Sequence, residues 1–437
     1  MLNFNHLRSI LHLGGSGGKT LVVALCTLFV SSVDAAESWT RFRGPNGQGV
    51  VDNVVFDPKI LSEPSLWTVE LPGVGASSPI IDGNRVYITS ATEENADDPA
   101  KHAVVHHVRC YETKSGRFLW DCKERSIPFK KHRLNTYATT TPVIGGDRLF
   151  YSIATPEEYR VFAVDKQTGK PLWTRKLGPF RSENGIGYSL IVTEGLVIVP
   201  NEQKEKEQAG EACEILALNA ETGEIVWRLP RKTPHTPSST PCLRNGELIT
   251  TSSAHGVCGI DPKTGTERWS VRPMTLRVVS SPVLCDDLVF VANGVGGVGR
   301  EMVAAKICDG KAEVAYELKK PFVFPYVPTS VVGKTTAGKR LFTVGDYGDV
   351  TCLDPVTGKI LGTKSIEGVF YGSPIILGNV MLVVSFEGVL YALSIADMPE
   401  LLNRVELGQA SKGTPAYADG RLFLRTDSKL MAFALFR

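Results

Sequence analysis

Short apolar runs alternate with polar turns along most of this chain, and one arrangement of them recurs. After a Ser/Thr-Pro pair come an apolar run, a turn of Gly, Asn or Asp, and a second apolar run, as in PIIDGNRVYIT after Ser78. Such runs bounded by turn residues predict β-hairpins, and Pro at the first strand position is tolerated because its missing N–H is not needed there. The units that begin in this way start at Pro79, Pro142, Pro241, Pro282, Pro374 and Pro415.

A second pattern follows many of these hairpins and predicts a second hairpin in the same unit. A strand ends in Asp, Glu or Asn, a turn closes on Gly, and a Trp stands four residues later. The copies are CYETKSGRFLW (110–120), AVDKQTGKPLW (163–173), ALNAETGEIVW (217–227) and GIDPKTGTERW (259–269), while CLDPVTGKILG (352–362) keeps the turn without the Trp. Gly can adopt the left-handed conformation that closes such a turn, and Asp and Thr side chains can bond neighbouring backbone groups. Each unit therefore has four predicted strands.

Two further units are degenerate: Leu190 stands where Pro is expected, and Val327 precedes Pro328 in place of Ser or Thr. With these included, eight units recur, about 48 residues apart on average. This repetition predicts an all-β fold, an eight-bladed β-propeller of four-stranded antiparallel blades. The last unit has only three strands, and SLWTVELPG (65–73) supplies one strand without a unit. We expect this strand, around Trp67, to complete the final blade, so that the propeller spans residues 65–437.

The first 35 residues have the features of a secretory signal peptide. Arg8 and Lys19 precede the apolar run TLVVALCTLFV (20–30), and small residues follow it up to Ala35. This order of a basic region, an apolar run and small residues is typical of a cleaved export signal, and the run is too short for a membrane span. We expect an exported protein, periplasmic or extracellular, with no transmembrane segment in the mature chain. Residues 36–64 then form an N-terminal extension.

Charge and cysteine content exclude some classes of protein. The formal net charge is +2, which gives no reason to expect binding to nucleic acid or to an anionic membrane. Eight cysteines follow the predicted signal peptide, without any zinc-ligand spacing. They are interpreted mainly as small packing residues in strands. An exported protein could also pair them, and Cys110 with Cys122 is the pair best placed on one hairpin, although in a diagonal register.

The segments that lead into the first strand of each unit are the candidate binding site. They differ between units while the turns do not, and variation on one face of a repeat fold often marks the binding face. In a propeller these segments meet at one end of the central channel, which we call the channel mouth. The candidate ligand-binding residues there are Asn135, Tyr137, Arg181, Glu183, Asn184, Tyr188, His235, Arg277, Tyr326, Tyr371 and Lys412, accompanied by Lys131, His132 and Arg133. Basic and aromatic side chains could hold a flat or anionic ligand by ion pairing and stacking.

Simpler interpretations of the same residues stay open. The mouth residues could be ordinary polar rim residues around water, since loops are polar by default. His132 and His235 are expected to be solvated. His106 and His107, beside the acidic loop 92–102, could bind a metal ion, but nothing in their spacing supports such a site.

The repeated Asp-x-x-Thr-Gly-x-x-x-Trp pattern resembles the tryptophan-docking repeat of propellers similar to those that bind pyrroloquinoline quinone (PQQ). This resemblance implies that Trp67, Trp120, Trp173, Trp227 and Trp269 pack between neighbouring blades. The segment WTRFRGPNGQGV (39–50) also resembles the opening of exported planctomycete-type PQQ-like repeat proteins. The likeness covers the chain from Trp39 onward.

The resemblance leads to two functional expectations. Quinoprotein dehydrogenases of this superfamily bind PQQ and Ca²⁺, with an Asp base and commonly an adjacent Cys-Cys pair, which this chain lacks. The mouth segments also contain few carboxylates for calcium. The related outer-membrane assembly propeller binds partner proteins without a cofactor. We therefore expect a monomeric, exported, non-catalytic scaffold, without cofactor or metal, that binds a partner protein or a small anionic ligand. PQQ/Ca²⁺-dependent oxidation of an alcohol or sugar is the alternative.

Overall fold

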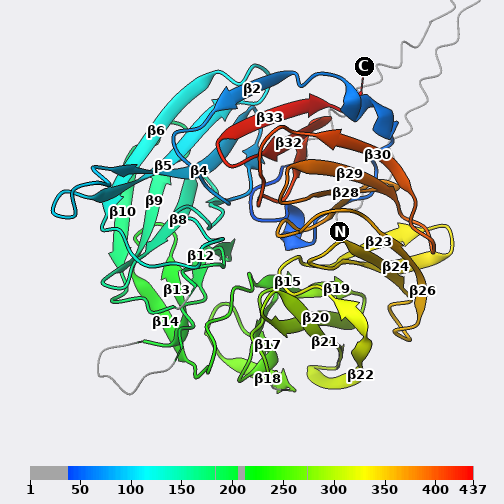
Figure 1. Cartoon of the computed structure of the whole chain (residues 1–437). Coiled ribbons are helices and arrows are strands. Elements are labelled where there is room, and N and C mark those ends of the chain that lie inside the picture. Colours follow the sequence, from blue (N-terminus) through cyan, green and yellow to red (C-terminus); the bar gives the residue numbers. More distant parts are fainter. Residues whose placement is uncertain (1–37, 183, 205–211, 273, 437) are drawn as a thin grey trace, which may run out of the picture. The chain divides into compact units, whose positions relative to one another are not determined.

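The structure is a computed structural model, and it describes residues 38–436 apart from 183, 205–211 and 273. The predicted signal peptide lies outside the described residues. Residues 36–437 form one compact unit of β-sheets arranged in a ring (Figure 1). Eight sheets of four antiparallel strands, one of them with an added fifth strand, confirm the predicted eight-bladed propeller.

The first four blades follow one another along the chain. Blade 1 contains β3 (Ile80–Asp82), β4 (Arg85–Glu94), β5 (Ala103–Glu112) and β6 (Phe118–Ser126), and blade 2 contains β7 (Val143–Gly145), β8 (Arg148–Ala154), β9 (Tyr159–Asp165) and β10 (Pro171–Lys176). Blade 3 contains β11 (Ile191–Thr193), β12 (Leu196–Val199), β13 (Glu214–Asn219) and β14 (Ile225–Pro230), and blade 4 contains β15 (Cys242–Arg244), β16 (Glu247–Ser252), β17 (Gly256–Ile260) and β18 (Glu267–Val271).

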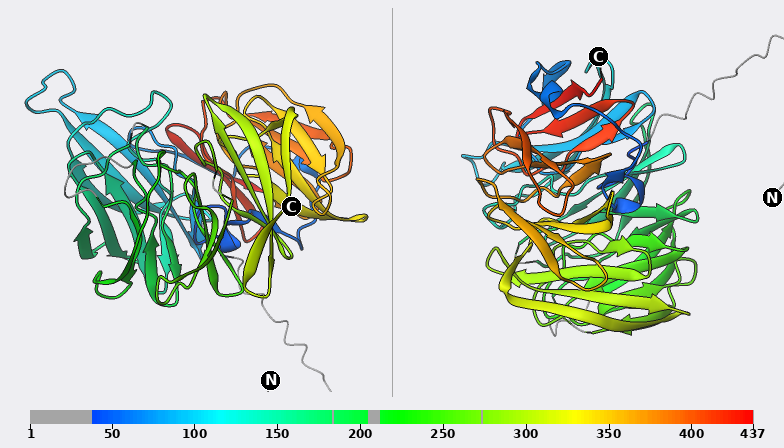
Figure 2. Two further views of the ribbon diagram at one scale, coloured as in Figure 1. Left: turned by 90° about the horizontal axis from the view of Figure 1, so that it is seen from below. Right: turned by 90° about the vertical axis from the view of Figure 1, so that its right-hand side faces the viewer.

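The other four blades complete the ring, which Figure 2 shows from two further directions. Blade 5 contains β19 (Val283–Cys285), β20 (Leu288–Val295), β21 (Val298–Cys308) and β22 (Lys311–Phe324), and blade 6 contains β23 (Val331–Thr335), β24 (Gly338–Val344), β25 (Asp349–Leu353) and β26 (Ile360–Ser365). Blade 7 contains β27 (Ile375–Leu377), β28 (Val380–Val384), β29 (Val389–Ser394) and β30 (Leu401–Glu406), and blade 8 contains β31 (Ala416–Ala418), β32 (Arg421–Arg425), β33 (Lys429–Ala434) and β2 (Trp67–Glu70).

The two ends of the described chain close the ring together. Strand β2 pairs antiparallel with β33, with Trp67 opposite Ala432 and Glu70 opposite Lys429. This pairing confirms that the strand around Trp67 supplies the fourth strand of the last blade. Because the first and last parts of the sequence share one sheet, unfolding of either end exposes the other.

A circle of hydrogen bonds joins the blades at their first strands. The residue before each first-strand Pro position donates its backbone N–H to the hydroxyl of the same position in the next blade, at 2.9–3.0 Å. The donors and acceptors run Ser78 to Thr141, Ser189, Thr240, Ser281, Thr329, Ser373, Thr414 and back to Ser78. The recurring Ser/Thr thus acts as the acceptor that satisfies a buried N–H of its neighbour.

This circle corrects the alignment of the sixth unit. Thr329, and not Val327, occupies the hydroxyl position, and Ser330 takes the place of the Pro before β23. The sixth unit therefore keeps its hydroxyl residue and lacks the Pro. The prediction aligned this unit on Pro328. The ring requires the hydroxyl at this position and tolerates the loss of the Pro, so Thr329 is the equivalent residue.

The N-terminal extension is an integral part of the ring. Trp39 pairs with Ile81 of β3, and the backbone amide of Ile144 in β7 donates to the carbonyl of Thr40. Further on, strand β1 (Val50–Val51) lies parallel to β27 as the fifth strand of that sheet. The segment therefore crosses the innermost strands from blade 1 to blade 7, as the blue trace in the middle of the ring shows (Figure 1).

Two short 3-10 helices belong to this same region. Helix η1 (Pro45–Gly47) turns the chain beside β15, and η2 (Pro58–Ser62) packs on β30 and β33. The side-chain amide of Asn403 in β30 donates to the carbonyl of Pro58 at 2.8 Å. Helix η2 thus covers the place between blades 7 and 8 that a Trp occupies at other blade junctions.

Candidate functional site at the channel mouth

The mouth loops precede the Ser/Thr circle and are braced to one another. The side-chain amide of Asn135 donates to the carbonyl of Asn184 at 2.6 Å, which joins the loops entering blades 2 and 3. Arg277 donates from Nε to the carbonyl of Thr236 at 2.7 Å and from Nη2 to Ser238 Oγ at 2.9 Å. Asn135, Asn184 and Arg277, all predicted to bind ligand, therefore hold adjacent loops in place.

A pocket of about 340 Å³ lies at the loop that enters blade 2. Its lining includes Lys131, Asn135 and Tyr137 together with Thr92 and Glu93 of β4. The Lys131 ammonium lies 4.3 Å from the centre of the Tyr137 ring, a cation–π contact. Burial, and secondarily the Glu93 carboxylate, raises the pKa of the Tyr137 phenol. The structure thus brings predicted mouth residues together in one cavity, which has a cation, an anion and a phenol on its walls.

A second group of mouth residues, Tyr371, Phe386 and Lys412, is called the rim cluster here. The rings of Tyr371 and Phe386 meet edge to face at 5.6 Å, and Lys412 Nζ lies 5.1 Å from the Phe386 ring centre. Burial, followed by the phenol of Tyr347 and the carboxylate of Asp346, raises the pKa of Tyr371, while the Arg133 guanidinium acts in the opposite direction. The charge of Arg133, on the loop entering blade 2, thus acts on the pKa of Tyr371, on the loop entering blade 7.

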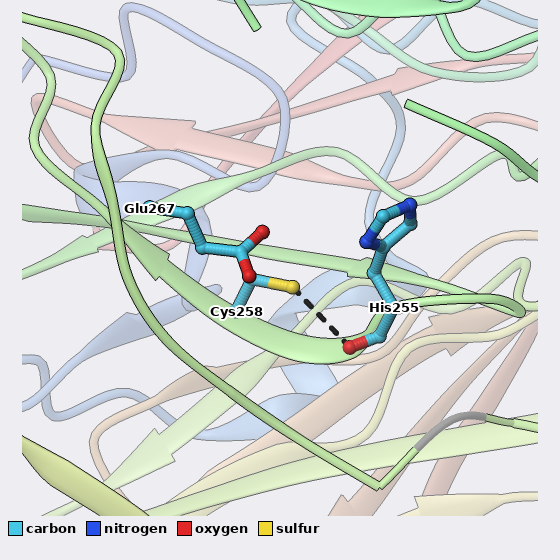
Figure 3. A group of neighbouring side chains, drawn as sticks. All are labelled: His255, Cys258 and Glu267. Carbon is cyan, nitrogen blue, oxygen red and sulfur yellow. Dashed lines mark hydrogen bonds between the residues drawn. The ribbon is translucent and has the colours of Figure 1, made fainter. Parts of the chain in front are cut away.

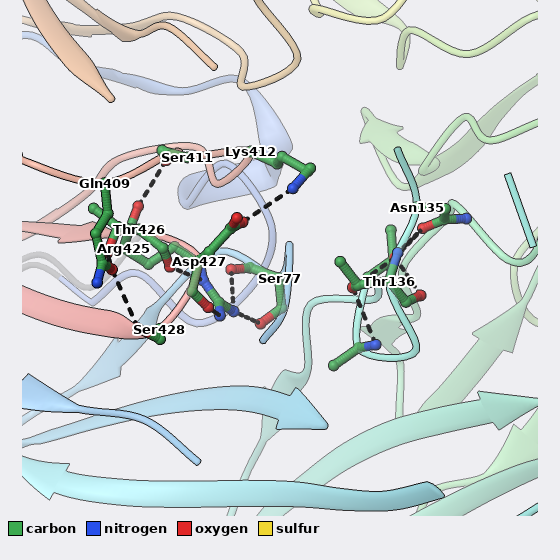
Figure 4. A network of polar contacts seen from close by, with 12 residues as sticks. Ser77, Asn135, Thr136, Gln409, Ser411, Lys412, Arg425, Thr426, Asp427 and Ser428 are labelled. Carbon is green, nitrogen blue, oxygen red and sulfur yellow. Dashed lines mark hydrogen bonds and ion pairs between the residues drawn. The ribbon is translucent and has the colours of Figure 1, made fainter. Parts of the chain in front are cut away.

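Polar contacts beneath the rim cluster tie blade 8 to blade 1 (Figure 4). Lys412 Nζ pairs with Asp427 at 3.0 Å, and the buried Arg425 donates from Nη1 to the carbonyl of Thr89 at 2.9 Å and to Ser77 Oγ at 3.1 Å. Burial lowers the pKa of Arg425 to about 10, so it stays charged at neutral pH. This network makes the mouth rigid at the junction where the chain ends meet.

The remaining predicted residues differ in how accessible they are. Tyr188 is fully buried and packs against Tyr159 and Phe180, so it belongs to the core between blades 2 and 3 and is not exposed at the mouth. Tyr326 is 9 % exposed, while Arg181 and His235 are exposed. Glu183 lies outside the described residues.

Asp346 is a mouth residue that the sequence analysis missed. It is buried at the turn between β24 and β25, and it accepts the backbone N–H groups of Tyr326 at 2.6 Å and Val327 at 3.1 Å. Burial raises its pKa to about 6, although these two hydrogen bonds favour the ionised form. The signal in the sequence was the first of two carboxylates in the turn VGDYGDV (344–350), which joins two apolar strands.

Four of the five tryptophans predicted to pack between blades lie on the turn of the next blade. A Cβ added to Gly116, Gly169, Gly223 or Gly265 would come within 2.8 Å of the ring of Trp67, Trp120, Trp173 or Trp227, respectively. The indole of Trp227 also donates to the carbonyl of Pro262 at 2.9 Å. The turn Gly and the Trp of the previous unit therefore form one contact between blades.

Trp269 departs from this arrangement. Its indole N–H donates to the Glu247 carboxylate at 3.1 Å and its ring covers Gly259, both in its own blade. The next blade turns tightly at Asp309 and Gly310, between β21 and β22, and this short turn offers no surface for docking. Trp269 is buried against residues of blade 5 and so lies between neighbouring blades, but it does not lie on a turn as the other four do.

Tyr316 replaces a docking Trp in blade 5, which the sequence analysis did not find. Its ring lies 2.6 Å from a Cβ built on Gly358, and its hydroxyl donates to the carbonyl of Pro355 at 2.7 Å. The turn DPVTG (354–358) of the fifth copy thus receives a Tyr where the earlier copies receive a Trp.

His106 and His107 have separate partners on opposite faces of β5. His106 Nε2 bonds Ser126 Oγ at 2.8 Å, and His107 Nδ1 bonds the Asp121 carboxylate at 2.9 Å. Burial, followed by the charges of Arg160 and His107, lowers the pKa of His106 to about 4. The pair therefore serves polar contacts within blade 1, and its two rings do not converge.

One other cluster, His255, Cys258 and Glu267, has ligand atoms within 4.8 Å of one another (Figure 3). The buried Arg231 donates to Glu267 at 2.6 Å and to Cys258 Sγ at 3.3 Å, so a guanidinium already serves two of the three groups. Burial raises the pKa of the Cys258 thiol to about 12. Within this cluster, Glu267 therefore forms an ion pair with Arg231.

The cysteines that the structure describes are free thiols. Cys110 lies opposite Trp120 and Cys122 opposite Val108, which is the diagonal register expected from the sequence. None of the helices in the described part of the chain has the length and apolar character needed to span a membrane.

Together, the radial sheets, the turn-docked aromatic side chains and the braced mouth define a PQQ-like β-propeller. A family model described as outer membrane protein assembly factor BamB matches residues 63–184, 104–317 and 327–435. The chain therefore belongs to this family of PQQ-like repeat proteins.

Similar structures share the fold at low sequence identity. BamB from Moraxella catarrhalis superposes with a TM-score of 0.57 at 16 % identity, over 85 % of this chain and 97 % of that one. Quinohemoprotein alcohol dehydrogenase from Comamonas testosteroni gives a TM-score of 0.64 at 12 % identity, over 92 % and 81 %.

Two curated relatives from Pseudomonas putida match in sequence over short regions. Quinoprotein ethanol dehydrogenase is 26 % identical over 128 residues, which are 27 % of this chain and 19 % of that protein. Quinohemoprotein alcohol dehydrogenase ADH IIB is 25 % identical over 160 residues, which are 34 % and 23 %. The matched regions thus span about a fifth of these relatives' lengths.

Proposed function

We propose that this protein is an exported, non-catalytic binding propeller that holds a partner polypeptide or a small anionic ligand at its channel mouth. The observation that carries the proposal is the concentration of cations and aromatic rings there, with Lys131 on Tyr137 and Lys412 on Phe386. These cations can form ion pairs with the carboxylates of a ligand, and the rings offer a flat apolar surface to it. The braced loops support binding without large rearrangement, which lowers its entropic cost.

The direct test removes two mouth cations. Lys131→Ala/Arg133→Ala should weaken binding of a labelled peptide of alternating Glu and Tyr at least tenfold, measured by fluorescence anisotropy. The matched control is Lys114→Ala/Arg117→Ala, which removes the same charge from the exposed β5–β6 turn. Competition by free citrate would identify a small anion as the ligand class. Equal affinity in both double variants would reject the mouth as the site.

The export part of the proposal rests on the signal-like first 35 residues. Cell fractionation should find a shortened protein outside the cytoplasm, whose N-terminal sequence begins near residue 36. A full-length protein in the cytoplasm would reject it.

A PQQ-dependent dehydrogenase is the second candidate because the curated relatives are quinoproteins. Three carboxylates that the structure describes at the mouth, where Glu183 is not described, speak against PQQ with Ca²⁺. Asp346 accepts two backbone N–H groups, Asp427 pairs with Lys412, and Glu387 accepts the N–H of Val369. Calcium needs several oxygen ligands at one point, and these carboxylates already have other partners. Titration with PQQ and Ca²⁺, followed by quinone absorbance, should give no saturable binding; stoichiometric binding with dye reduction would establish the enzyme.

A further inference from the structure

Two arginines of the N-terminal segment are buried at the centre of the ring, on the far side of the Ser/Thr circle from the mouth. Arg41 donates from Nη2 to the carbonyl of Pro241 in blade 4. Arg43 donates from Nη2 to the carbonyl of Ser330, just before blade 6, at 2.7 Å, and to the carbonyl of Gln48 at 3.1 Å. Arg43 is fully buried and Arg41 is 8 % exposed. The two guanidinium groups therefore reach the inner strands of different blades from one short segment.

The segment folds tightly around these side chains. A Cβ on Gly47 would lie 3.2 Å from Arg41 Nη2, and one on Gly49 would lie 3.2 Å from Arg43 Nη2. Side-chain amides also fix the segment to the inner strands: Asn46 exchanges two hydrogen bonds with the backbone of Leu243, and Gln48 Oε1 accepts the N–H of Leu284. The guanidinium groups are thus held in a built site with little freedom to turn toward solvent.

Neither arginine has a carboxylate partner among the described residues. Arg41 bonds the carbonyl of Pro241, the residue before Cys242, and the Cys242 thiol is the ionisable group that acts on the pKa of both arginines. Burial raises the pKa of Cys242 to about 12, although both arginines oppose this shift, so the thiol is neutral at pH 7. Burial lowers the pKa of Arg41 to about 10 and that of Arg43 to about 9, and both remain protonated at neutral pH. Two positive charges are therefore buried on one short segment without a carboxylate partner among the described residues.

Several of their N–H donors are also without a partner. Arg41 Nε, Arg43 Nε and Arg43 Nη1 are buried and make no hydrogen bond within the described part of the chain. A buried donor without an acceptor is costly, and a buried charge without a counter-charge is costlier. Carbonyl oxygens accept hydrogen bonds from the Nη2 atoms of both arginines, and the Nε–H groups have no acceptor among the described residues. These donors lack an acceptor among the described residues, and the charge that they carry is not balanced there.

We propose that Arg41 and Arg43 form a binding site for a small inorganic monoanion of the halide class, enclosed between the N-terminal segment and the inner strands. The anion accepts from Arg41 Nε and Arg43 Nε and neutralises part of the buried charge. It acts as a structural ion that fastens the N-terminal segment across the ring. This site is separate from the mouth, so it does not depend on the proposed function.

Bromide is the probe, because its anomalous scattering identifies it directly. Crystals of the full mature chain grown in bromide should show an anomalous peak within about 3.5 Å of the Arg43 guanidinium. In solution, replacing gluconate by bromide at constant ionic strength should raise the Tm, by about 2 °C per tenfold increase above the dissociation constant. Ordered water without an anomalous peak, or a Tm equal in both salts, would overturn the proposal.

Variants separate this site from general salt effects. Arg41→Gln keeps a donor for the Pro241 carbonyl and should lose the bromide-dependent rise in Tm. Arg268→Gln, on the outer part of blade 4, removes an exposed guanidinium and should keep the rise. If Arg43→Met fails to fold, the bromide peak in the wild type and the Arg41→Gln comparison still decide the question. An unchanged rise in Arg41→Gln would contradict the assignment.

Discussion

At the scale of single residues, the contact between a turn Gly and the Trp of the preceding blade explains why both recur in the sequence. Gly265 has a φ of +73°, and a Cβ there would lie 2.5 Å from the Trp227 ring. Gly246 has a φ of +77° with nothing within 4 Å of such a Cβ. Gly265 and Gly246 share the same backbone conformation, and only Gly265 contacts an indole ring, so comparing them distinguishes backbone strain from that contact.

Gly265→Ala should therefore destabilise the protein more than Gly246→Ala. Both variants place Ala in the left-handed region, at a cost of about 1–2 kcal/mol. Gly265→Ala should cost about 1–3 kcal/mol more, since the methyl group forces the Trp227 ring away. Urea unfolding measures both values. Equal destabilisation would contradict the docking contact.

The buried His106 gives a pH dependence at the same scale. Its pKa is lowered to about 4 in the folded protein, against about 6.5 when unfolded, so the unfolded chain binds the proton first as the pH falls. Stability should fall between pH 6.5 and pH 4, on the order of 3 kcal/mol in total. His106→Gln, which can still bond Ser126, should remove this part of the slope in urea titrations. The exposed His235→Gln controls for loss of a histidine, and a slope equally reduced by both would contradict this origin.

At the scale of elements, the Ser/Thr circle links the first strands of all blades. Thr240 is buried, and its hydroxyl accepts the N–H of Ser189. Thr240→Val keeps the shape but leaves that N–H unsatisfied, which should cost about 1–3 kcal/mol. Thr240→Ser retains the acceptor and should cost under about 1 kcal/mol. Thermal unfolding compares the two, and a Val variant as stable as the Ser variant would show that the circle contributes nothing.

The elements also show how far the sequence could be interpreted. The turn residues and the Ser/Thr-Pro positions predict the eight blades, because each blade needs the same turns and the same hydroxyl acceptor. The sixth unit was misaligned at Val327 because a Pro stands beside the true hydroxyl position, Thr329. Residues 36–64 were predicted to be an extension that precedes the propeller, because they have no copy elsewhere in the chain. Within them, residues 39–51 bond to the inner strands of most blades.

The candidate site could be predicted only in part, for a similar reason. Loop position indicates which residues surround the mouth, and Asn135 and Tyr137 do line one pocket there. It does not indicate which polar side chains brace the loops, as Arg277 does, or which aromatic ring turns into the core, as Tyr188 does. Those outcomes depend on contacts between neighbouring blades, which a single sequence does not contain.

At the scale of the whole molecule, the ring has one face of variable loops and a centre crossed by the N-terminal segment. Arg425 and Ser77, from blade 8 and from the loop entering blade 1, bond to each other, so closure and the mouth share one network. A ligand at the rim cluster is therefore expected to stabilise the junction where the chain ends meet. The placement of every mouth residue depends on this closure.

Hydrogen–deuterium exchange of the β2 segment tests that closure most directly. If Trp67–Glu70 pairs with β33 as the last strand of blade 8, a peptide covering 65–71 should contain protected amides, although fewer than one covering 429–434, because β2 is an edge strand that pairs on one side only. Both should lose protection together as urea is added. Rapid exchange of 65–71 in a chain whose 429–434 segment stays protected would contradict the closed eight-bladed ring.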